Sequence, residues 1–128
     1  MYNKLLLPAS FIIFLLVGCI SESFKQKANE QFGDQHFKTA IALIELHKIR
    51  EGTYPNSLDN LKYLGDWDQI IFNSVEYIKL DEGYELNLTN GFMGKPKELK
   101  YPDEFWNGLG LRKSNLRIDP PKIKSRND

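Results

Sequence analysis

Residues 34–61, DQHFKTAIALIELHKIREGTYPNSLDNL, decide the fold. Apolar side chains recur there at the i, i+3, i+4, i+7 spacing of an amphipathic helix, in a stripe formed by Phe37, Ala40, Ile41 and Ile44 and widened by Leu43 and Leu46. Asp34 is suited to cap the start of this helix, and Glu51-Gly52 is a sequence at which a helix ends. The spacing therefore predicts one long helix from Asp34 to Glu51.

A turn and a series of short strands follow the predicted helix. Residues 53–57, TYPNS, indicate a turn in which Asn56 or Ser57 caps a short second helix. Asp81-Glu82-Gly83 lies between two stretches of strand-forming residues and predicts a hairpin loop. The sequence predicts strands at residues 75–80, 84–89, 98–101 and 109–112.

These elements predict an α+β domain in which the long helix packs across an antiparallel sheet of three to four strands. The domain spans residues 34–118, after a partly helical tether at 19–33 and before a disordered basic tail at 119–128. Since the helix and the sheet each have an apolar face that needs cover, we expect the two faces to pack on each other. The expected contacts join Ile41 and Ile44 to Leu86 and Leu88. The alternative is that the helical stripe is a free docking surface for a partner.

The composition limits the class of protein. The 128 residues are enough for one domain, and 41% hydrophobic with 27% charged residues fit a folded body rather than a disordered chain. Seventeen basic residues balance seventeen acidic ones, so no overall field points to nucleic acid. Bases outnumber acids six to two in residues 112–128, which we interpret as a solvated tail. A weak grip on anionic lipid or an acidic partner is the alternative for this tail.

The N-terminal residues have the three parts of a signal peptide. Residues 1–4 give a short basic start, and Leu5 to Val17 is an apolar run of thirteen residues, shorter than the about 20 that a spanning helix needs. Gly18 and the only cysteine, Cys19, come next and are followed by polar residues. The pattern predicts a signal peptide over residues 1–18. The alternative is an uncleaved anchor with an incidental cysteine.

Leu16-Val17-Gly18-Cys19 resembles the lipobox of bacterial lipoproteins. In that family a dedicated peptidase cuts before the cysteine, so the resemblance implies cleavage between Gly18 and Cys19 and lipidation of Cys19. Two or more acyl chains anchor a protein stably, since each buried CH₂ contributes about 0.8 kcal/mol. Ile20 replaces the Asp that holds Gram-negative lipoproteins at the inner membrane, which implies an outer-membrane anchor facing the periplasm. In a Gram-positive cell the anchor is in the outer face of the plasma membrane.

Three short motifs resemble the periplasmic half of pilin-like proteins, most of all the major pseudopilin of type II secretion. They are Gly52-Thr53-Tyr54-Pro55 after the helix, Leu58 and Leu61 in the next turn, and Gly83-Tyr84-Glu85-Leu86 in a strand. The resemblance covers residues 34–91 and implies a pilin-like fold.

The chain departs from the pilin pattern at its N-terminus. A pilin keeps its hydrophobic helix after cleavage, whereas here the apolar run precedes Gly18 and is lost with the leader. Ser23 stands at the fifth position after Gly18, where pilins have a Glu. The chain is therefore not expected to polymerise as a pilin does. The Asp-Pro-Trp-Gly segment of the pseudopilin is absent, so its calcium site is not carried over.

The sequence contains no recognisable catalytic or metal-binding constellation. His47 and Glu51 lie one helical turn apart and are interpreted as surface residues rather than cation ligands. No cofactor, nucleic acid or small-molecule substrate is expected. The aromatic residues are expected mainly in the core. Phe105 and Trp106 are the candidate exception, because they follow the segment Pro102-Asp103-Glu104, and an exposed aromatic pair there would contact a partner.

These observations predict a non-enzymatic lipoprotein, anchored to a membrane by its N-terminal lipid. It binds another envelope protein or forms part of an envelope assembly, such as one related to secretion or to a pilus. The alternative is an inhibitor or immunity-type lipoprotein that neutralises a toxin or an envelope enzyme.

Overall fold

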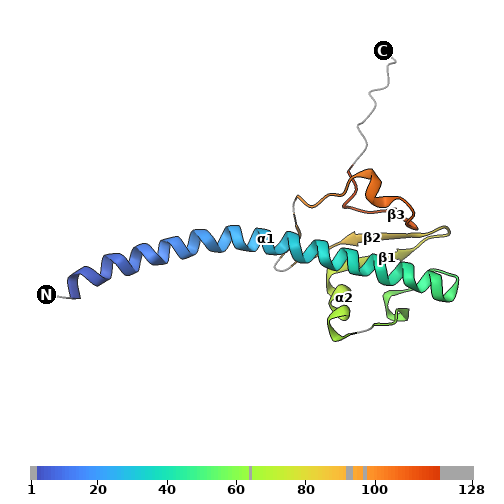
Figure 1. Cartoon of the computed structure of the whole chain (residues 1–128), viewed down its shortest axis with the longest axis horizontal. Coiled ribbons are helices and arrows are strands. Elements are labelled where there is room, and N and C mark those ends of the chain that lie inside the picture. Colours follow the sequence, from blue (N-terminus) through green and yellow to red (C-terminus); the bar gives the residue numbers. More distant parts are fainter. Residues whose placement is uncertain (1–2, 64, 92–93, 97, 119–128) are drawn as a thin grey trace, which may run out of the picture.

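The α+β class and the packing of one long helix on a small sheet are confirmed by the computed structural model (Figure 1). The structure describes residues 3–63, 65–91, 94–96 and 98–118, and side chains from Glu22 onward within these ranges, except those of Asp66 and Trp67. Helix α1 (Asn3–Glu51) runs along the molecule, and all other elements gather around its C-terminal half. They are η1 (Leu58–Asn60), η2 (Asp66–Ile70), α2 (Ile71–Ser74), β1 (Val75–Lys79), β2 (Tyr84–Leu88), η3 (Asp103–Trp106) and β3 (Leu111–Lys113).

Helix α1 begins long before Asp34, so the prediction that Asp34 caps its start was wrong. The preceding residues 22–33, which were expected to be partly helical, are mostly good helix formers without proline, and they continue the helix. The Asp34 carboxylate accepts a hydrogen bond from Tyr101 Oη at 2.5 Å and pairs with Lys38 Nζ at 2.9 Å. Asp34 therefore joins α1 to a distant segment rather than ending the helix.

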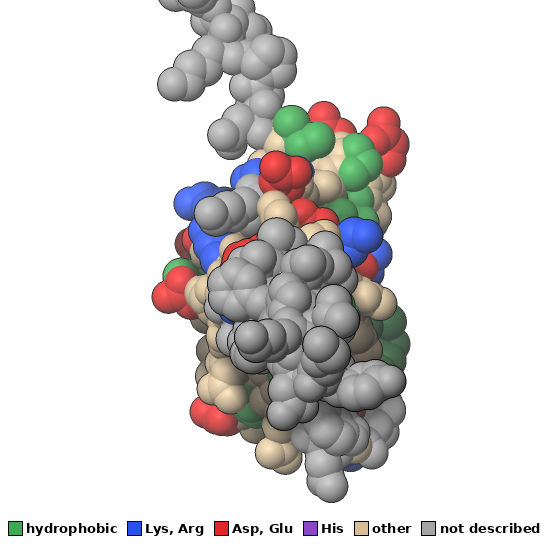
Figure 2. Space-filling view, turned by 90° about the vertical axis from the view of Figure 1, so that its left-hand side faces the viewer, with side chains coloured by type: hydrophobic (Ala, Val, Ile, Leu, Met, Phe, Trp, Pro, Cys, Tyr) green, Lys and Arg blue, Asp and Glu red, His purple; other side chains and the backbone are tan. Residues whose placement is uncertain are grey.

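The surface around the emerging helix carries both signs of charge. Figure 2 shows the molecule from the side at which the N-terminal part of α1 emerges, and acidic and basic side chains are interspersed around the visible rim. This mixture agrees with the equal numbers of acidic and basic residues in the chain. No field of a single sign therefore covers the visible rim.

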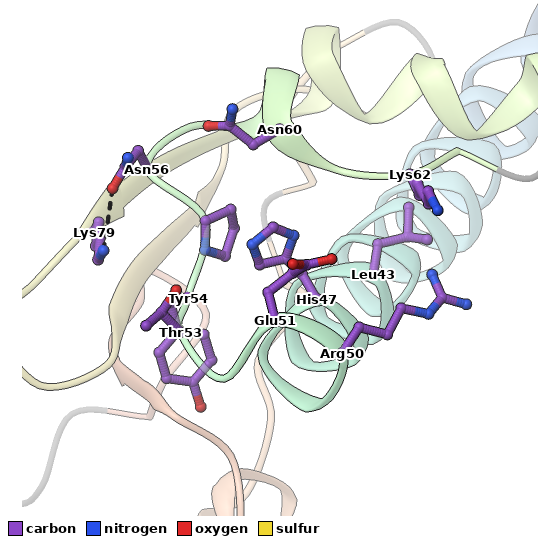
Figure 3. A pocket seen from close by; sticks show the side chains of 11 residues that line it. Leu43, His47, Arg50, Glu51, Thr53, Tyr54, Asn56, Asn60, Lys62 and Lys79 are labelled. Carbon is purple, nitrogen blue, oxygen red and sulfur yellow. Dashed lines mark hydrogen bonds between the residues drawn. The ribbon is translucent and has the colours of Figure 1, made fainter.

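The chain reverses direction directly after α1 (Figure 3). Gly52 has a φ of +80°, a conformation that side chains disfavour, and its N–H donates to Lys48 O at 2.9 Å. Ser57 is the N-cap residue of η1, one of the two caps predicted, and its N–H donates to Asn60 Oδ1 at 3.1 Å. The turn brings residues 53–62 beside the last turn of α1, where they line a pocket with it.

The sheet has three strands in the order β1-β2-β3. β1 and β2 form the predicted antiparallel hairpin, in register from Val75↔Leu88 to Lys79↔Tyr84. β3 lies on the other side of β2 and is parallel to it, so the sheet is mixed rather than antiparallel throughout. The parallel pairing arises because the connection from β2 returns the chain to the start of that strand, where Tyr84 N–H donates to Gly110 O at 2.9 Å.

The strand predicted at residues 98–101 did not form. Of its residues, Tyr101 makes an isolated parallel bridge to Arg117. Pro96 and Pro102 flank this short segment, and a proline cannot donate a hydrogen bond to a sheet. The two prolines therefore disfavour a regular strand in this segment.

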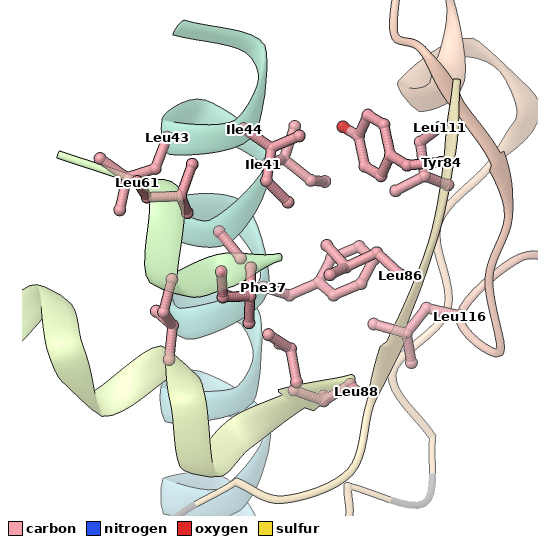
Figure 4. Packing of buried hydrophobic residues seen from close by; sticks show 14 of the residues in the cluster. Phe37, Ile41, Leu43, Ile44, Leu61, Tyr84, Leu86, Leu88, Leu111 and Leu116 are labelled. Atoms are coloured by element: carbon pink, nitrogen blue, oxygen red, sulfur yellow. The ribbon is translucent and has the colours of Figure 1, made fainter. Parts of the chain in front are cut away.

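One buried cluster joins α1 to the sheet (Figure 4). On β2 the three inward side chains, Tyr84, Leu86 and Leu88, are fully buried. Phe37 and Ile44 of α1 are fully buried as well, and Phe37 points toward Leu86. The apolar stripe of α1 is therefore covered by the sheet and is not a free docking surface. The four residues of the expected helix–sheet contact, Ile41, Ile44, Leu86 and Leu88, all belong to this cluster.

Candidate functional site

A polar pocket of about 470 Å³ opens beside the last turn of α1 (Figure 3). Segments far apart in the sequence build it, because the turn after α1 folds back and the end of β1 comes to lie next to that turn. The side chains that give the pocket its polarity are His47, Arg50 and Glu51 of α1, Asn56, Asn60 and Lys62 of the following segment, and Lys79 at the end of β1.

Positive charge predominates in this pocket. Its lining contains three cationic side chains, Arg50, Lys62 and Lys79, and one acidic side chain, Glu51. Lys79 Nζ donates to Asn56 Oδ1 at 3.1 Å, whereas neither Arg50 nor Lys62 forms an ion pair or hydrogen bond with another residue in the described part of the chain. The pocket is therefore suited to an anionic group rather than to a cation.

A second pocket, of about 520 Å³, lies between α1 and α2. Phe32 of α1 and Ile71 of α2 line it, and its exposed surface is mostly apolar, although most of the lining residues, such as Gln35 and Asn73, are polar. Ser74 Oγ and His36 Nδ1 lie 2.8 Å apart at this pocket, and burial lowers the pKa of His36. We call this pocket the α1–α2 groove.

The Ser74–His36 pair holds α2 against α1. A serine nucleophile needs an exposed hydroxyl and an oriented base, but Ser74 is 3% exposed and its Oγ also lies 3.3 Å from Ile70 O. Among the described residues, no hydrogen bond orients the other ring nitrogen of His36. The geometry thus favours a hydrogen bond between two elements over a catalytic dyad.

The Glu45 carboxylate is the other polar centre of the domain. It accepts hydrogen bonds from Tyr84 Oη at 3.0 Å, Tyr54 Oη at 3.1 Å and the N–H of Gly110 at 2.7 Å. Burial, together with the charge of Glu45, raises the pKa of both phenols, so they remain proton donors. This centre joins α1 to β2 and to the residue before β3. The two hydroxyl groups and the N–H of Gly110 all donate to the Glu45 carboxylate.

Phe105 and Trp106 are not the exposed aromatic pair that was predicted. Trp106 is 4% exposed, and Phe105 is half-buried with its ring stacked on Tyr101 at a centroid distance of 4.1 Å. The prediction was wrong because Phe37 and Tyr101 form an aromatic cluster that covers the pair. The Arg117 guanidinium lies over the Trp106 ring at 5.4 Å, and the Trp106 Nε1–H has no hydrogen-bond partner in the described structure.

The predicted lipidation site lies at the edge of what the structure describes. The backbone of Gly18 and Cys19 belongs to α1, but their side chains are outside the described set, as are residues 119–128 of the predicted tail. Within the described part of the chain, no helix is apolar over a length that spans a bilayer. Likewise, no group of three or more His, Cys, Asp or Glu side chains there could hold a metal ion.

No family model matches the chain, and no curated protein or solved structure matches it either.

Sequence reasoning missed the polar pocket. The spacing of His47 and Glu51 was visible, but both were interpreted as ordinary surface residues. Lys79 reaches the pocket because the pairing of β1 with β2 places the end of β1 beside Asn56. A local sequence pattern does not show that two segments distant in the chain lie side by side, so the basic residues of this pocket could not be grouped from the sequence.

Proposed function

We propose that this chain is a non-enzymatic, lipid-anchored protein of the bacterial envelope that binds another envelope protein. The lipobox-like residues Leu16-Val17-Gly18-Cys19 support the anchor. The proposed location is the outer membrane with the domain in the periplasm, or the outer face of the plasma membrane in a Gram-positive cell. The likeness to pilin-like periplasmic domains supports a place in a secretion- or pilus-related assembly.

The observation that carries the binding role is a pair of aromatic side chains on α1. Phe24 is 65% exposed and Phe32 is 40% exposed. Residues four apart lie near the same face of a helix, so Phe24 and Phe32 lie toward the same side of α1, with the buried Ala28 between them. We call Phe24 and Phe32 the aromatic stripe.

The aromatic stripe leads into the α1–α2 groove, because Phe32 also lines that groove. A single exposed apolar side chain is ordinary on a protein surface, but two exposed aromatic side chains on one side of a helix, one of them lining a groove, mark a candidate docking surface. Aromatic side chains contribute strongly to protein–protein binding because they bury a large area at a low entropic cost. The stripe and groove therefore fit a partner that lies along α1.

The position of the stripe agrees with a membrane-anchored partner complex. Phe24 is five residues after Cys19, which corresponds to about 7.5 Å along a helix. A partner that contacts Phe24 and Phe32 is thus held between the membrane surface and the α+β domain. This arrangement suits a neighbouring envelope protein more than a ligand that binds the far end of the domain.

Acyl labelling tests the anchor. In the parent cell, Cys19→Ala should abolish incorporation of labelled fatty acid and leave the leader uncleaved, because the acylated thiol is missing. Cys19→Ser offers a hydroxyl of similar size and should also fail to label. Labelling of either variant at the level of the unmodified protein contradicts the proposed anchor.

Site-specific photo-cross-linking tests the binding role. A photoreactive amino acid at position 24 should give a discrete adduct with one envelope protein in cells, and Phe32→Ala should reduce its yield. The same probe at Lys113, an exposed position on β3, is the matched control and should give none. A toxin or envelope enzyme in the adduct would identify the inhibitor alternative, and equal patterns at both positions would contradict docking on the stripe.

A further inference from the structure

We infer that the polar pocket beside the last turn of α1 binds a phosphate group, held by Arg50 and Lys62. Arg50 of α1 and Lys62 of the segment after η1 line one side of a cavity of about 470 Å³, and Lys79 at the end of β1 lines the other side beside Asn56 (Figure 3). With Glu51 as the one acidic side chain in the lining, the formal charge of the pocket is positive. This site is separate from the aromatic stripe and does not depend on the proposed partner.

The cations of the pocket are not explained by the needs of the helix end. Basic side chains near a helix C-terminus commonly bind its free carbonyl groups. Here Lys48 has that role, since its Nζ donates to Gly52 O at 2.6 Å. Arg50 makes no hydrogen bond to a carbonyl in the described part of the chain, so its guanidinium donors are available to a ligand.

Two amide side chains add neutral donors to the same pocket. Asn60 Oδ1 already accepts from Ser57 N–H at 3.1 Å, and Asn56 Oδ1 accepts from Lys79 Nζ at 3.1 Å. Because both Oδ1 atoms already accept hydrogen bonds, the NH₂ group of each asparagine is the donor available to a ligand. The pocket thus combines charged and neutral donors, which suits an acceptor with several oxygens.

This donor set favours a phosphate over a single carboxylate. One arginine is enough to hold a planar carboxylate in a bidentate pair, whereas lysines bind phosphate as point charges from several directions. The cavity also falls within the range of about 300–1,000 Å³ typical of small-molecule sites, so it admits a phosphate together with the group that carries it. The pocket lies at the end of α1 opposite to the N-terminus (Figure 1). If Cys19 carries the proposed lipid anchor, the pocket points away from the membrane, so the expected source of the phosphate is a soluble molecule or an envelope polymer rather than a lipid headgroup.

Titration of the full chain, kept in solution with mild detergent, tests the inference. Inorganic pyrophosphate serves as the probe for a soluble phosphate, and a glycerol phosphate polymer serves as the probe for an envelope polymer. We expect saturable nuclear magnetic resonance shifts at the side chains of His47, Asn56 and Asn60 with one of the two probes. Sodium acetate at the same ionic strength should cause no saturable shift.

Charge-neutralising variants give the discriminating result. The double variant Arg50→Gln with Lys62→Gln should weaken binding of the effective probe at least about tenfold, which corresponds to about 1.4 kcal/mol. Lys113→Gln removes an exposed lysine elsewhere and should leave the affinity unchanged. The inference is overturned if neither probe gives a saturable shift. It is also overturned if the pocket variant and the control variant weaken probe binding equally. Circular dichroism of each variant shows whether the fold is retained.

Discussion

The carboxylate of Glu45 accepts the hydroxyl hydrogen of Tyr84 at 3.0 Å, although 39 positions separate the two residues in the chain. The same oxygen accepts the N–H of Gly110 at 2.7 Å. One side chain of α1 thus fixes the position of the central strand β2 and of the residue that precedes β3. The parallel pairing of β3, which the sequence did not predict, depends on this junction.

Removal of the Glu45 carboxylate should therefore destabilise the domain. In Glu45→Ala the Tyr84 hydroxyl and the Gly110 N–H lose their acceptor, and Tyr84 is fully buried. A buried donor without a partner costs about 1–3 kcal/mol, so we expect the free energy of unfolding to fall by about 2–4 kcal/mol. Urea denaturation measures this change. Glu76→Ala, at an exposed position of β1, is the control and should change stability by less than about 0.5 kcal/mol.

Two glycines with positive φ should respond differently to alanine. Gly52 has a φ of +80° with open space where a Cβ would lie, so Gly52→Ala should cost about 1–2 kcal/mol for the backbone conformation alone. Gly83 has a φ of +89°, and a Cβ there would overlap the carbonyl oxygen of Gly110. Gly83→Ala should cost at least about 2 kcal/mol more, because β2 and the segment before β3 must separate. Similar unfolding midpoints for the two variants would contradict this close approach.

Alkaline pH should weaken the fold through Tyr77. Burial, with a smaller effect of Tyr54, raises the pKa of Tyr77 to about 12, and its hydroxyl donates to Pro55 O at 2.5 Å. In the unfolded chain the phenol ionises near pH 10. Since the folded pKa is the higher one, the stabilisation is complete below pH 10 and is lost as the pH rises from about 10 to about 12.

Unfolding measured at several pH values checks this dependence. The free energy of unfolding should decline across that interval, and Tyr77→Phe should make the decline shallower. Burial also raises the pKa of Tyr63 to about 12, so an ultraviolet titration of the folded variant should show one late-ionising phenol fewer than the unmodified protein. An unchanged slope in Tyr77→Phe would assign the alkaline sensitivity to other groups.

Local patterns predicted much of the fold. The spacing of Phe37, Ile41 and Ile44 identified the buried face of α1, and the alternation of Tyr84, Leu86 and Leu88 identified the inward face of β2. Both patterns are repeats of neighbouring residues, so they are visible in the sequence. The start of α1 was misplaced because Asp34 has the chemistry of a cap, and its actual partner, Tyr101, lies 67 residues away.

The candidate site was less predictable for the same physical reason. The polar pocket forms because the turn at Gly52 and the hairpin that carries Lys79 come together in the fold. The packing of two distant segments against each other cannot be read from a local sequence pattern. Trp106 was expected at the surface because its neighbours in the sequence are polar, but its cover comes from Phe37 on α1. Long-range contacts of this kind determined which aromatic side chains stayed exposed, and they left Phe24 rather than Trp106 at the surface.

The last prediction distinguishes the structural face of α1 from its exposed faces. Ile44 is fully buried in the cluster that joins α1 to β2, whereas Ile49, five residues later on the same helix, is 79% exposed. Truncation of a buried isoleucine costs about 2–5 kcal/mol, out of a total stability of about 5–15 kcal/mol for an ordinary domain. Ile44→Ala should therefore lower the unfolding midpoint in urea clearly, while Ile49→Ala should change the free energy of unfolding by less than about 0.5 kcal/mol. Both substitutions remove the same atoms from the same helix, so helix propensity cancels in the comparison and burial remains as the difference. If the two variants unfold at the same denaturant concentration, α1 does not pack on the sheet through Ile44, and the stripe that contains it is free to bind a partner.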